Sequence, residues 1–218
     1  MSSERRFDLV AFDMDGVLVK HDSTWTWIHD HFEVSNEESL REFIEGRIDD
    51  REFMRRDIAL WREQRPLLDI GYIEGVLDPL PEVNGVRETV ASLREAGMRT
   101  VIISGGLDIV ASGLARKYGF DGWAANGLEV GEDGLLTGNG ILRVELVNKR
   151  KSLDRFLQRW DVPGERAAAV GNSFVDVSMF NGCGFSIAFN PIDAWVAENA
   201  SSVVNSDDLG DILPLLLD

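Results

Sequence analysis

The chain has 218 residues, of which 44% are hydrophobic and 9% aromatic, and its 38 acidic residues outnumber 22 basic ones, so that the net charge is −16. A chain of this length folds around a sizeable core, either as one domain with an insertion or as two small domains. A surface this acidic repels nucleic acid and anionic membranes, and we expect neither as a partner. A dense layer of carboxylates also keeps proteins soluble in concentrated salt, which makes a halophilic source one hypothesis.

The single cysteine, Cys183, excludes an intrachain disulfide and a metal cluster of cysteines. It lies beside an apolar run, where a small buried side chain is its default role. The N-terminal stretch lacks the continuous apolar run of a secretory signal, and no segment approaches the ~20 apolar residues that span a bilayer. We therefore expect a cytoplasmic protein, and the sequence leaves both a monomer and a homodimer open.

The first predicted element is a buried strand over residues 9–13, and it ends in the carboxylates of Asp13 and Asp15, followed by Gly16. Open parallel sheets present their ligands at the carboxyl ends of the strands. Two carboxylates at such an end form a site for a divalent cation and an electrophile, and one of them can act as a nucleophile. Because aspartate and glycine are also ordinary turn residues, a solvated turn is the alternative for this motif taken alone.

Residues 21–78 predict a strongly charged, all-helical insert after the first strand. Its helical patterns lie near 24–32, 37–45, 51–63 and 69–77, and prolines mark its end at Pro66, Pro79 and Pro81. We interpret 21–78 as a helical cap, and 1–20 together with 79–218 as the core domain.

The cap holds three histidines and three tryptophans. The histidines favour solvated or capping roles over a zinc site, because neighbours two apart on a helix do not share a face; they are His21, His29 and His31. The tryptophans have the spacing of the interior of the cap; they are Trp25, Trp27 and Trp61. Trp25 is also a candidate for the substrate pocket, because it lies three residues after Asp22, an acidic residue at the start of the cap.

Strands alternate with amphipathic helices through the rest of the chain. The predicted strands cover 100–104, 167–171, 185–189 and 202–204, and the helices cover 84–96, 107–118 and 148–160. Residues 127–144 predict a hairpin around the turn Gly131-Glu132-Asp133-Gly134. Because this alternation requires crossover connections, we predict an α/β fold with a parallel sheet, helices on both of its faces and the inserted cap.

Three further polar motifs follow predicted strands or open a helix. Ser104-Gly105-Gly106 offers a hydroxyl and open backbone N–H groups that can bind phosphate, although a tight turn explains it equally well. In Asn148-Lys149-Arg150-Lys151 a lysine could neutralise a nucleophile and a phosphate, although a solvated basic run is the default. Asn172 and Asp176, after the strand 167–171, offer oxygen ligands suited to Mg²⁺. The order of the four motifs is far more specific than any one of them.

With these motifs in this order, the chain resembles the haloacid dehalogenase superfamily of phosphohydrolases over essentially its whole length. The helical cap after the first motif resembles the phosphoserine phosphatase branch. Three segments share that resemblance: Ile103-Ser104-Gly105-Gly106-Leu107-Asp108-Ile109, Leu136-Thr137-Gly138 and Asp176-Val177-Ser178-Met179-Phe180. The resemblance implies a Rossmann-like core with a helical cap that closes over the site.

The resemblance also implies a role for each catalytic and phosphate-binding residue. Asp13 would be the nucleophile that forms an aspartyl-phosphate, and Asp15 would protonate the leaving alcohol and then deprotonate the hydrolytic water. Ser104, Gly105 and Lys149 would hold the transferring phosphoryl group. The spacing from Asn148-Lys149 to Leu153 favours Lys149 over Lys151 for this role.

The implied cofactor is Mg²⁺. Its ligands would be the Asp13 carboxylate, the Asp15 backbone carbonyl and the fourth motif, in which Asp176 acts through water. The family pattern has Gly-Asp where this chain has Gly171-Asn172, so that one negative charge is missing. Because an amide oxygen still binds Mg²⁺, we expect an active enzyme with weakened metal affinity.

The cap also departs from the phosphoserine branch, which holds the amino and carboxylate groups of its substrate with a glutamate and an arginine. Here Asp22 stands at the acidic position and Asp57 at the arginine position. Arg55 and Arg56 are adjacent and could substitute, although helix neighbours point in different directions. Since Asp57 would repel a substrate carboxylate, phosphoserine is not the favoured substrate.

We predict a Mg²⁺-dependent phosphatase that hydrolyses a small phosphorylated metabolite by way of an aspartyl-phosphate. One alternative is carbon–halogen hydrolysis, which also uses an aspartate nucleophile and tolerates asparagine in the fourth motif, but it has no need of Asp15. Another alternative is a catalytically weak binding or regulatory protein. The presence of Asp13, Lys149 and Asp176 disfavours this second alternative.

Overall fold

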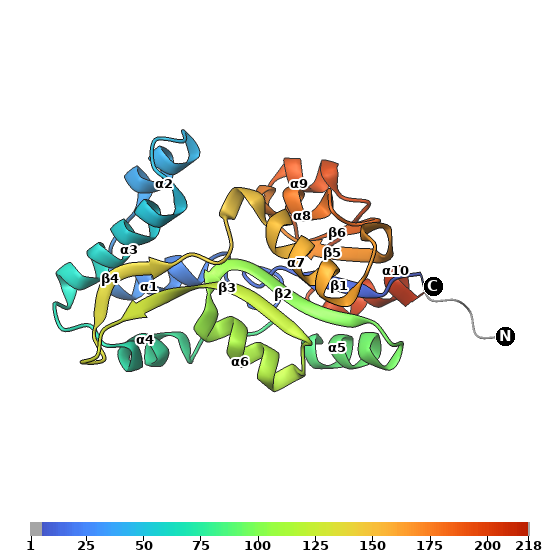
Figure 1. Cartoon of the computed structure of the whole chain (residues 1–218), viewed down its shortest axis with the longest axis horizontal. Coiled ribbons are helices and arrows are strands. Elements are labelled where there is room, and N and C mark those ends of the chain that lie inside the picture. The colour runs from blue at the N-terminus through green and yellow to red at the C-terminus, as the bar shows by residue number, and fades with distance from the viewer. Residues whose placement is uncertain (1–5, 218) are drawn as a thin grey trace.

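A seven-stranded sheet in the order β4-β3-β2-β1-β5-β6-β7 runs through the computed structural model, which describes residues 6–217 (Figure 1). The strands are β1 (Leu9–Phe12), β2 (Arg99–Leu107), β3 (Gly122–Val130), β4 (Leu136–Ile141), β5 (Ala167–Gly171), β6 (Phe185–Phe189) and β7 (Ser202–Val204). All neighbouring pairs are parallel except β3 and β4, which form the predicted hairpin. The predicted α/β class is therefore confirmed.

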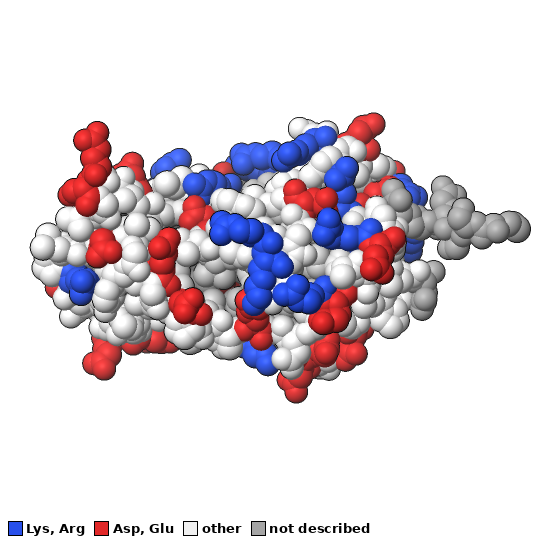
Figure 2. All heavy atoms as spheres, turned by 90° about the horizontal axis from the view of Figure 1, so that it is seen from below, with Lys and Arg blue, Asp and Glu red and all other residues white. Residues whose placement is uncertain are grey.

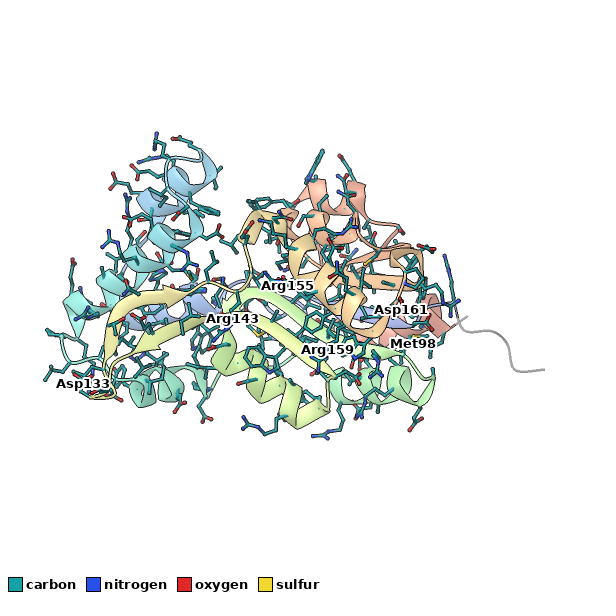
Figure 3. The ribbon with its side chains drawn as sticks, in the orientation of Figure 1. Met98, Asp133, Arg143, Arg155, Arg159 and Asp161 are labelled. Atoms are coloured by element: carbon teal, nitrogen blue, oxygen red, sulfur yellow. The ribbon has the colours of Figure 1, made fainter. Side chains whose placement is uncertain are left out.

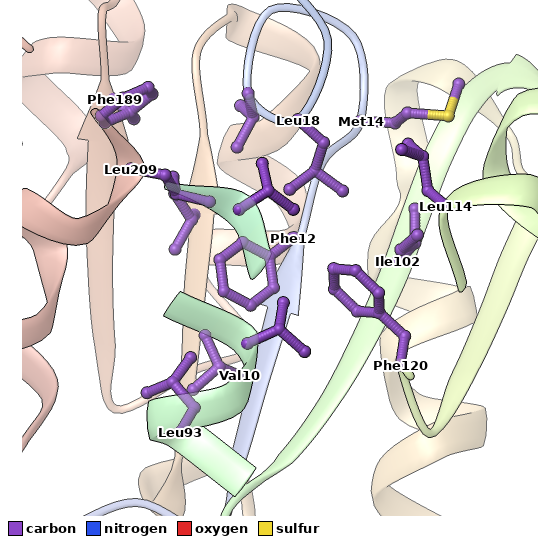
Figure 4. Packing of buried hydrophobic residues seen from close by; sticks show 14 of the residues in the cluster. Val10, Phe12, Met14, Leu18, Leu93, Ile102, Leu114, Phe120, Phe189 and Leu209 are labelled. Atoms are coloured by element: carbon purple, nitrogen blue, oxygen red, sulfur yellow. The ribbon is translucent and has the colours of Figure 1, made fainter. Parts of the chain in front are cut away.

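Successive side chains of a strand point to opposite faces of the sheet, so the buried apolar strands supply a core on each face. In β1, Val10 and Phe12 belong to one apolar cluster, and Leu9 and Ala11 belong to another. The first cluster packs α5 (Val86–Glu95), α6 (Asp108–Tyr118) and α10 (Leu213–Leu217), and the second packs α7 (Arg150–Trp160), α8 (Val177–Phe180) and α9 (Ala194–Asn199). Figure 4 shows Phe12 and Phe120 together in the first cluster. Their rings meet edge-on, with 5.9 Å between the ring centroids.

Four helices follow β1 where the sequence predicts them: α1 (Thr24–Phe32), α2 (Glu37–Ile44), α3 (Asp50–Gln64) and α4 (Ile70–Leu77). Three of these helices begin at a polar side chain that accepts a hydrogen bond from the first turn, namely Ser23, Asp49 and Asp69. Such caps explain why the helix starts can be read from local sequence.

The helical insert shares its apolar core with the hairpin. Trp61 and Ile73 pack in one cluster with Leu136 of β4, and the Leu136 N–H donates to the Leu68 carbonyl at 2.9 Å. Figure 3 shows Asp133 at the turn of this hairpin, at the end of the molecule formed by the insert. The division into a core (1–20 and 79–218) and a cap (21–78) stays a prediction, and residues 1–5 and 218 of that division lie outside the described residues.

Strand β2 extends beyond its predicted end at Ser104 and includes Gly105 and Gly106. The tight turn that is the alternative explanation for Ser104-Gly105-Gly106 therefore does not occur at these residues, and α6 begins at Asp108, one residue after its predicted start. A Cβ atom at Gly106 would overlap the side chains of Asp15 and Thr24. The two glycines thus allow the strand to continue while the insert packs closely against it.

Charged side chains of both signs are interspersed on the face of the molecule in Figure 2, so the net charge is not gathered there into one acidic patch. Within residues 6–217, every helix is too short or too polar to cross a lipid bilayer.

Candidate active site

The carboxyl ends of three neighbouring strands, β2, β1 and β5, meet below the helical insert. A cavity of about 270 Å³ lies between this edge and helices α1 to α3. The lining residues from the four sequence motifs are Asp13, Asp15, Ser104, Gly105, Gly106, Lys149 and Asn172. The fold therefore brings together residues that are up to 159 positions apart in the chain.

Lys149 lies between two buried carboxylates. Its Nζ is 2.8 Å from Asp13 Oδ1 and 2.6 Å from Asp176 Oδ1, and the Lys149 side chain is only 1% exposed. Burial alone would lower the pKa of Lys149, but the charges of Asp13 and Asp176 raise it above its usual value. Lys149 is thus held as a cation beside the candidate nucleophile.

The Asp13 carboxylate is fixed through one oxygen. Asp13 Oδ1 accepts a hydrogen bond from the Met14 N–H at 2.7 Å and contacts Lys149, which leaves Oδ2 free of these two donors. Burial and the nearby Asp176 raise the pKa of Asp13 to about 7, against the opposing effect of Lys149. A carboxylate oriented in this way can attack an electrophile in the cavity.

The Asp15 carboxyl is held by the first residue of α1. Its Oδ2 accepts hydrogen bonds from the Thr24 N–H at 3.1 Å and the Thr24 hydroxyl at 3.2 Å, while its buried Oδ1 has no hydrogen-bond partner among the described residues. Burial raises the pKa of Asp15 to about 6, although the Thr24 hydrogen bonds and Lys149 lower it in part. A carboxyl with such a pKa can both give and take a proton near neutral pH.

Ser104 and Gly105 belong to β2 and line the cavity. Ser104 Oγ accepts a hydrogen bond from the Gly106 N–H at 3.0 Å, and the Gly105 carbonyl accepts from Trp25 Nε1 at 3.1 Å and from Asn126 Nδ2 at 3.2 Å. The glycine backbone is therefore fixed from both the insert and β3.

Asp176 organises the loop after β5. Its Oδ2 accepts hydrogen bonds from the N–H groups of Asn172 at 2.9 Å and Ser173 at 3.1 Å, and its Oδ1 contacts Lys149. Both carboxylate oxygens are thus already bonded within the protein. In this structure Asp176 positions Lys149 and Asn172, and it does not itself line the cavity.

The candidate cap residues separate into two groups. Asp22 and Trp25 line the cavity, and Trp25 also stacks on Trp61 with 5.3 Å between ring centroids. In contrast to the expectation for the arginines, neither Arg55 nor Arg56 lines it. Both guanidinium groups bind Glu52, at 2.7 and 2.8 Å, and that of Arg56 also binds Glu42 of α2 at 2.6 Å.

Lys151 also lies away from the cavity, because its ammonium binds the exposed Glu145 at 2.6 Å.

Two residues of the site, Asn126 and Asp50, lie outside the motifs that the sequence predicts for it. Asn126, a polar residue within apolar β3, donates to the carbonyls of Gly105 and Val144 and so joins the end of β2 to the segment after β4. Asp50 of α3 accepts a hydrogen bond from the Leu146 N–H at 2.8 Å across the cavity. A polar side chain in an apolar run is the local feature that points to Asn126.

His29 differs from the expectation that the cap histidines are solvated or capping, because its side chain is only 2% exposed. Trp61 Nε1 donates to His29 Nδ1 at 2.8 Å, and His29 Nε2 lies 3.4 Å from Asp57 Oδ2. Asp57 is itself buried and lines the cavity.

Residues 7–184 match the family model of haloacid dehalogenase-like hydrolases. The chain belongs to this family. Among curated haloacid dehalogenase-like relatives, the phosphoserine phosphatase of Methanocaldococcus jannaschii is 29% identical over 214 residues, which cover 96% of this chain and 98% of that protein. The resemblance stated from the sequence motifs is thereby confirmed.

Solved structures of phosphoserine phosphatase share the same fold. A substrate-bound complex superimposes with a TM-score of 0.81 at 28% identity and covers 98% of this chain and 100% of the other. A phospho-aspartyl intermediate analogue gives the same TM-score and identity, with 97% and 100% of the two chains covered.

This haloacid dehalogenase-like site offers the oxygen atoms that a hard divalent cation prefers. Mg²⁺ is usually bound by one or two carboxylates with water and substrate phosphate completing its shell. Asp13, Asp15 and Asn172 line one cavity together and supply oxygen atoms suited to such a cation. Among residues 6–217 there is no group of three or more acidic, histidine or cysteine side chains that could hold a metal. Since Asn172 is neutral, the three donors carry less negative charge than they would with an aspartate at position 172.

Proposed function

We propose that this protein is a Mg²⁺-dependent phosphomonoesterase that hydrolyses a small phosphorylated metabolite through an aspartyl-phosphate on Asp13. The observation that carries the proposal is the buried Lys149 ammonium, 2.8 Å from Asp13 Oδ1 in a cavity that Ser104 also lines. A fixed cation beside a carboxylate nucleophile suits transfer of a dianionic phosphoryl group. The similarity to phosphoserine phosphatases over nearly the whole chain supports the same reaction class.

In the proposed mechanism, Asp13 attacks phosphorus through a carboxylate oxygen, and the bond from phosphorus to the ester oxygen breaks. Asp15 gives its proton to the departing alkoxide, which a pKa raised to about 6 by burial makes feasible near neutral pH. Asp15 then takes a proton from the water that hydrolyses the aspartyl-phosphate. Ser104 and Lys149 hold the phosphoryl oxygens throughout.

Mg²⁺, held by Asp13, Asn172 and the backbone of Asp15, would offset the charge of the phosphoryl group. Asp176 contributes indirectly, because it fixes the backbone of Asn172 and the position of Lys149.

The test is phosphate release from p-nitrophenyl phosphate and a panel of small phosphomonoesters, with Mg²⁺ or with EDTA. Wild type is compared with Asp13→Asn and with Asp30→Asn, a matched control whose side chain is 68% exposed on α1. We expect Mg²⁺-dependent release that Asp13→Asn abolishes and Asp30→Asn preserves. Release that survives Asp13→Asn, or no release from any ester, would refute the proposal.

We also propose that the net charge of −16 adapts the protein to concentrated salt. The assay is therefore run in molar KCl and repeated after dialysis into low salt, with circular dichroism at both steps. Loss of structure in low salt is the expected result, and an unchanged spectrum would contradict the adaptation.

A further inference from the structure

The cavity above the nucleophile is acidic on the side formed by the insert. Three carboxylates from that side line it, those of Asp22, Asp50 and Asp57. Among the described residues that line the cavity, Lys149 is the only lysine or arginine, and it contacts Asp13 and Asp176 at the phosphoryl end. A leaving group with a carboxylate would therefore meet three like charges and no cation.

Asp57 is the buried member of this set, and the side chains that its carboxylate contacts among residues 6–217 are those of Asn36 and His29. Asn36 Nδ2 donates to Asp57 Oδ1 at 3.0 Å. The adjacent guanidinium groups of Arg55 and Arg56 are drawn away by Glu52. These cations of α3 therefore do not compensate the Asp57 charge.

His29 approaches Asp57 as a neutral imidazole. The indole N–H of Trp61 can only donate, so His29 Nδ1 must be the acceptor of their 2.8 Å hydrogen bond. The single remaining ring proton is then on Nε2, which is buried, lacks a hydrogen-bond partner among residues 6–217 and lies 3.4 Å from Asp57 Oδ2. A protonated His29 would direct a second N–H at the Trp61 donor.

A buried carboxylate with only neutral neighbours is costly unless a cation completes it. The same cavity is lined by the aromatic rings of Trp25, Phe43 and Phe53, whose faces attract organic cations. Its volume of about 270 Å³ restricts the occupant to a small molecule.

We propose that the substrate is the phosphomonoester of a small alkylammonium alcohol without a carboxylate, whose cationic nitrogen is bound between Asp57 and the aromatic rings of the cap. This inference rests on the proposed phosphatase function and names its substrate class. His29, Trp61 and Asn36 act as positioning residues that hold the Asp57 carboxylate toward the cavity.

The test uses three non-hydrolysable phosphonates of matched shape, measured by calorimetric titration with Mg²⁺ present. 3-Aminopropylphosphonate carries the ammonium, butylphosphonate replaces the ammonium by a methyl group, and 2-amino-4-phosphonobutanoate adds a carboxylate beside the ammonium. We expect the first to bind wild type about 10–100-fold more tightly than either of the others, as for hydrogen bonds between charged groups. Tighter or equal binding of butylphosphonate or of the carboxylated compound would overturn the inference.

Variants then assign the preference to Asp57. Asp57→Asn should bring the affinities for the ammonium and methyl compounds within about threefold of each other, whereas Asp30→Asn should keep the wild-type difference. If a folded Asp57→Asn variant kept the full preference for the ammonium compound over the methyl compound, the role of Asp57 would be overturned. Should that variant fail to fold, the three affinities of the wild-type protein still test the substrate class.

Hydrolysis of p-nitrophenyl phosphate, which has no ammonium, separates this inference from the proposed function. Asp13-dependent hydrolysis without a preference for ammonium ligands would leave the phosphatase and refute the substrate class. A clear preference without hydrolysis of any ester would refute the phosphatase and leave a cation-selective site.

Discussion

Replacing Lys149 by methionine removes the ammonium between two buried carboxylates and keeps most of the side-chain volume. Lys149 Nζ lies 2.8 Å from Asp13 Oδ1 and 2.6 Å from Asp176 Oδ1, and these carboxylates are 5% and 0% exposed. At an effective dielectric constant of about 20, each attraction is about 6 kcal/mol before desolvation is subtracted. Removal of one partner from a buried ion pair costs about 3–5 kcal/mol, because the remaining charge stays buried without compensation.

The matched control is Lys151→Met, two residues further along. Lys151 Nζ binds Glu145 at 2.6 Å, but the two side chains are 57% and 38% exposed, so the loss should be about 0.2–1 kcal/mol. Since 1 kcal/mol shifts the melting temperature by about 2–4 °C for a chain of this size, we expect a decrease of about 6–20 °C for Lys149→Met and less than about 4 °C for Lys151→Met.

The assays are thermal unfolding followed by circular dichroism, and phosphate release from p-nitrophenyl phosphate at matched folded concentration. Lys149→Met should also reduce turnover by a factor of about 10²–10³, as loss of one electrostatic contact to a transition state does. Equal melting temperatures for the two variants, or a larger effect of Lys151→Met, would refute the assignment of Lys149 as the buried cation.

Three further predictions concern single positions. Asn172→Asp adds an anionic oxygen donor, so the Mg²⁺ concentration for half-maximal activity should fall about tenfold or more, and an unchanged requirement would contradict a metal-binding role for position 172. Gly16 has φ +74°, and a Cβ atom there would overlap the Asn172 amide, so Gly16→Ala should lower the free energy of unfolding in urea by about 2–4 kcal/mol. The control is Gly134→Ala, at φ +80° in open space, which should lower it by only about 1 kcal/mol. Equal losses for the two variants would show that the overlap at Gly16 is relieved. Burial raises the pKa of the Cys183 thiol to about 12, so at pH 8 its reaction with a disulfide reagent should be about tenfold or more slower in the native protein than in urea, and equal rates would place the thiol in solvent.

The sequence identifies most of the fold because its signals are local. These signals are the continuous apolar run of residues 9–12, polar caps such as Ser23 and Asp49, and the turn at Gly134. Each depends on neighbours within a few positions. Strand β2 is the exception, since its continuation through Gly105 and Gly106 depends on packing against the distant Asp15 and Thr24.

The order of the four polar motifs determines the family and the chemistry of the phosphoryl end. Tertiary structure decides which of two nearby lysines is buried, because Lys149 faces Asp176 whereas Lys151 binds Glu145 in solvent. It also decides the character of the substrate end. The neutral partners of Asp57 are His29 of α1 and Asn36, which precedes α2, whereas Asp57 belongs to α3. Only the packing of these segments leaves the charge of Asp57 for a ligand. Burial and charge pairing arise only where segments distant in the sequence pack together, and a local pattern of residues does not encode this packing.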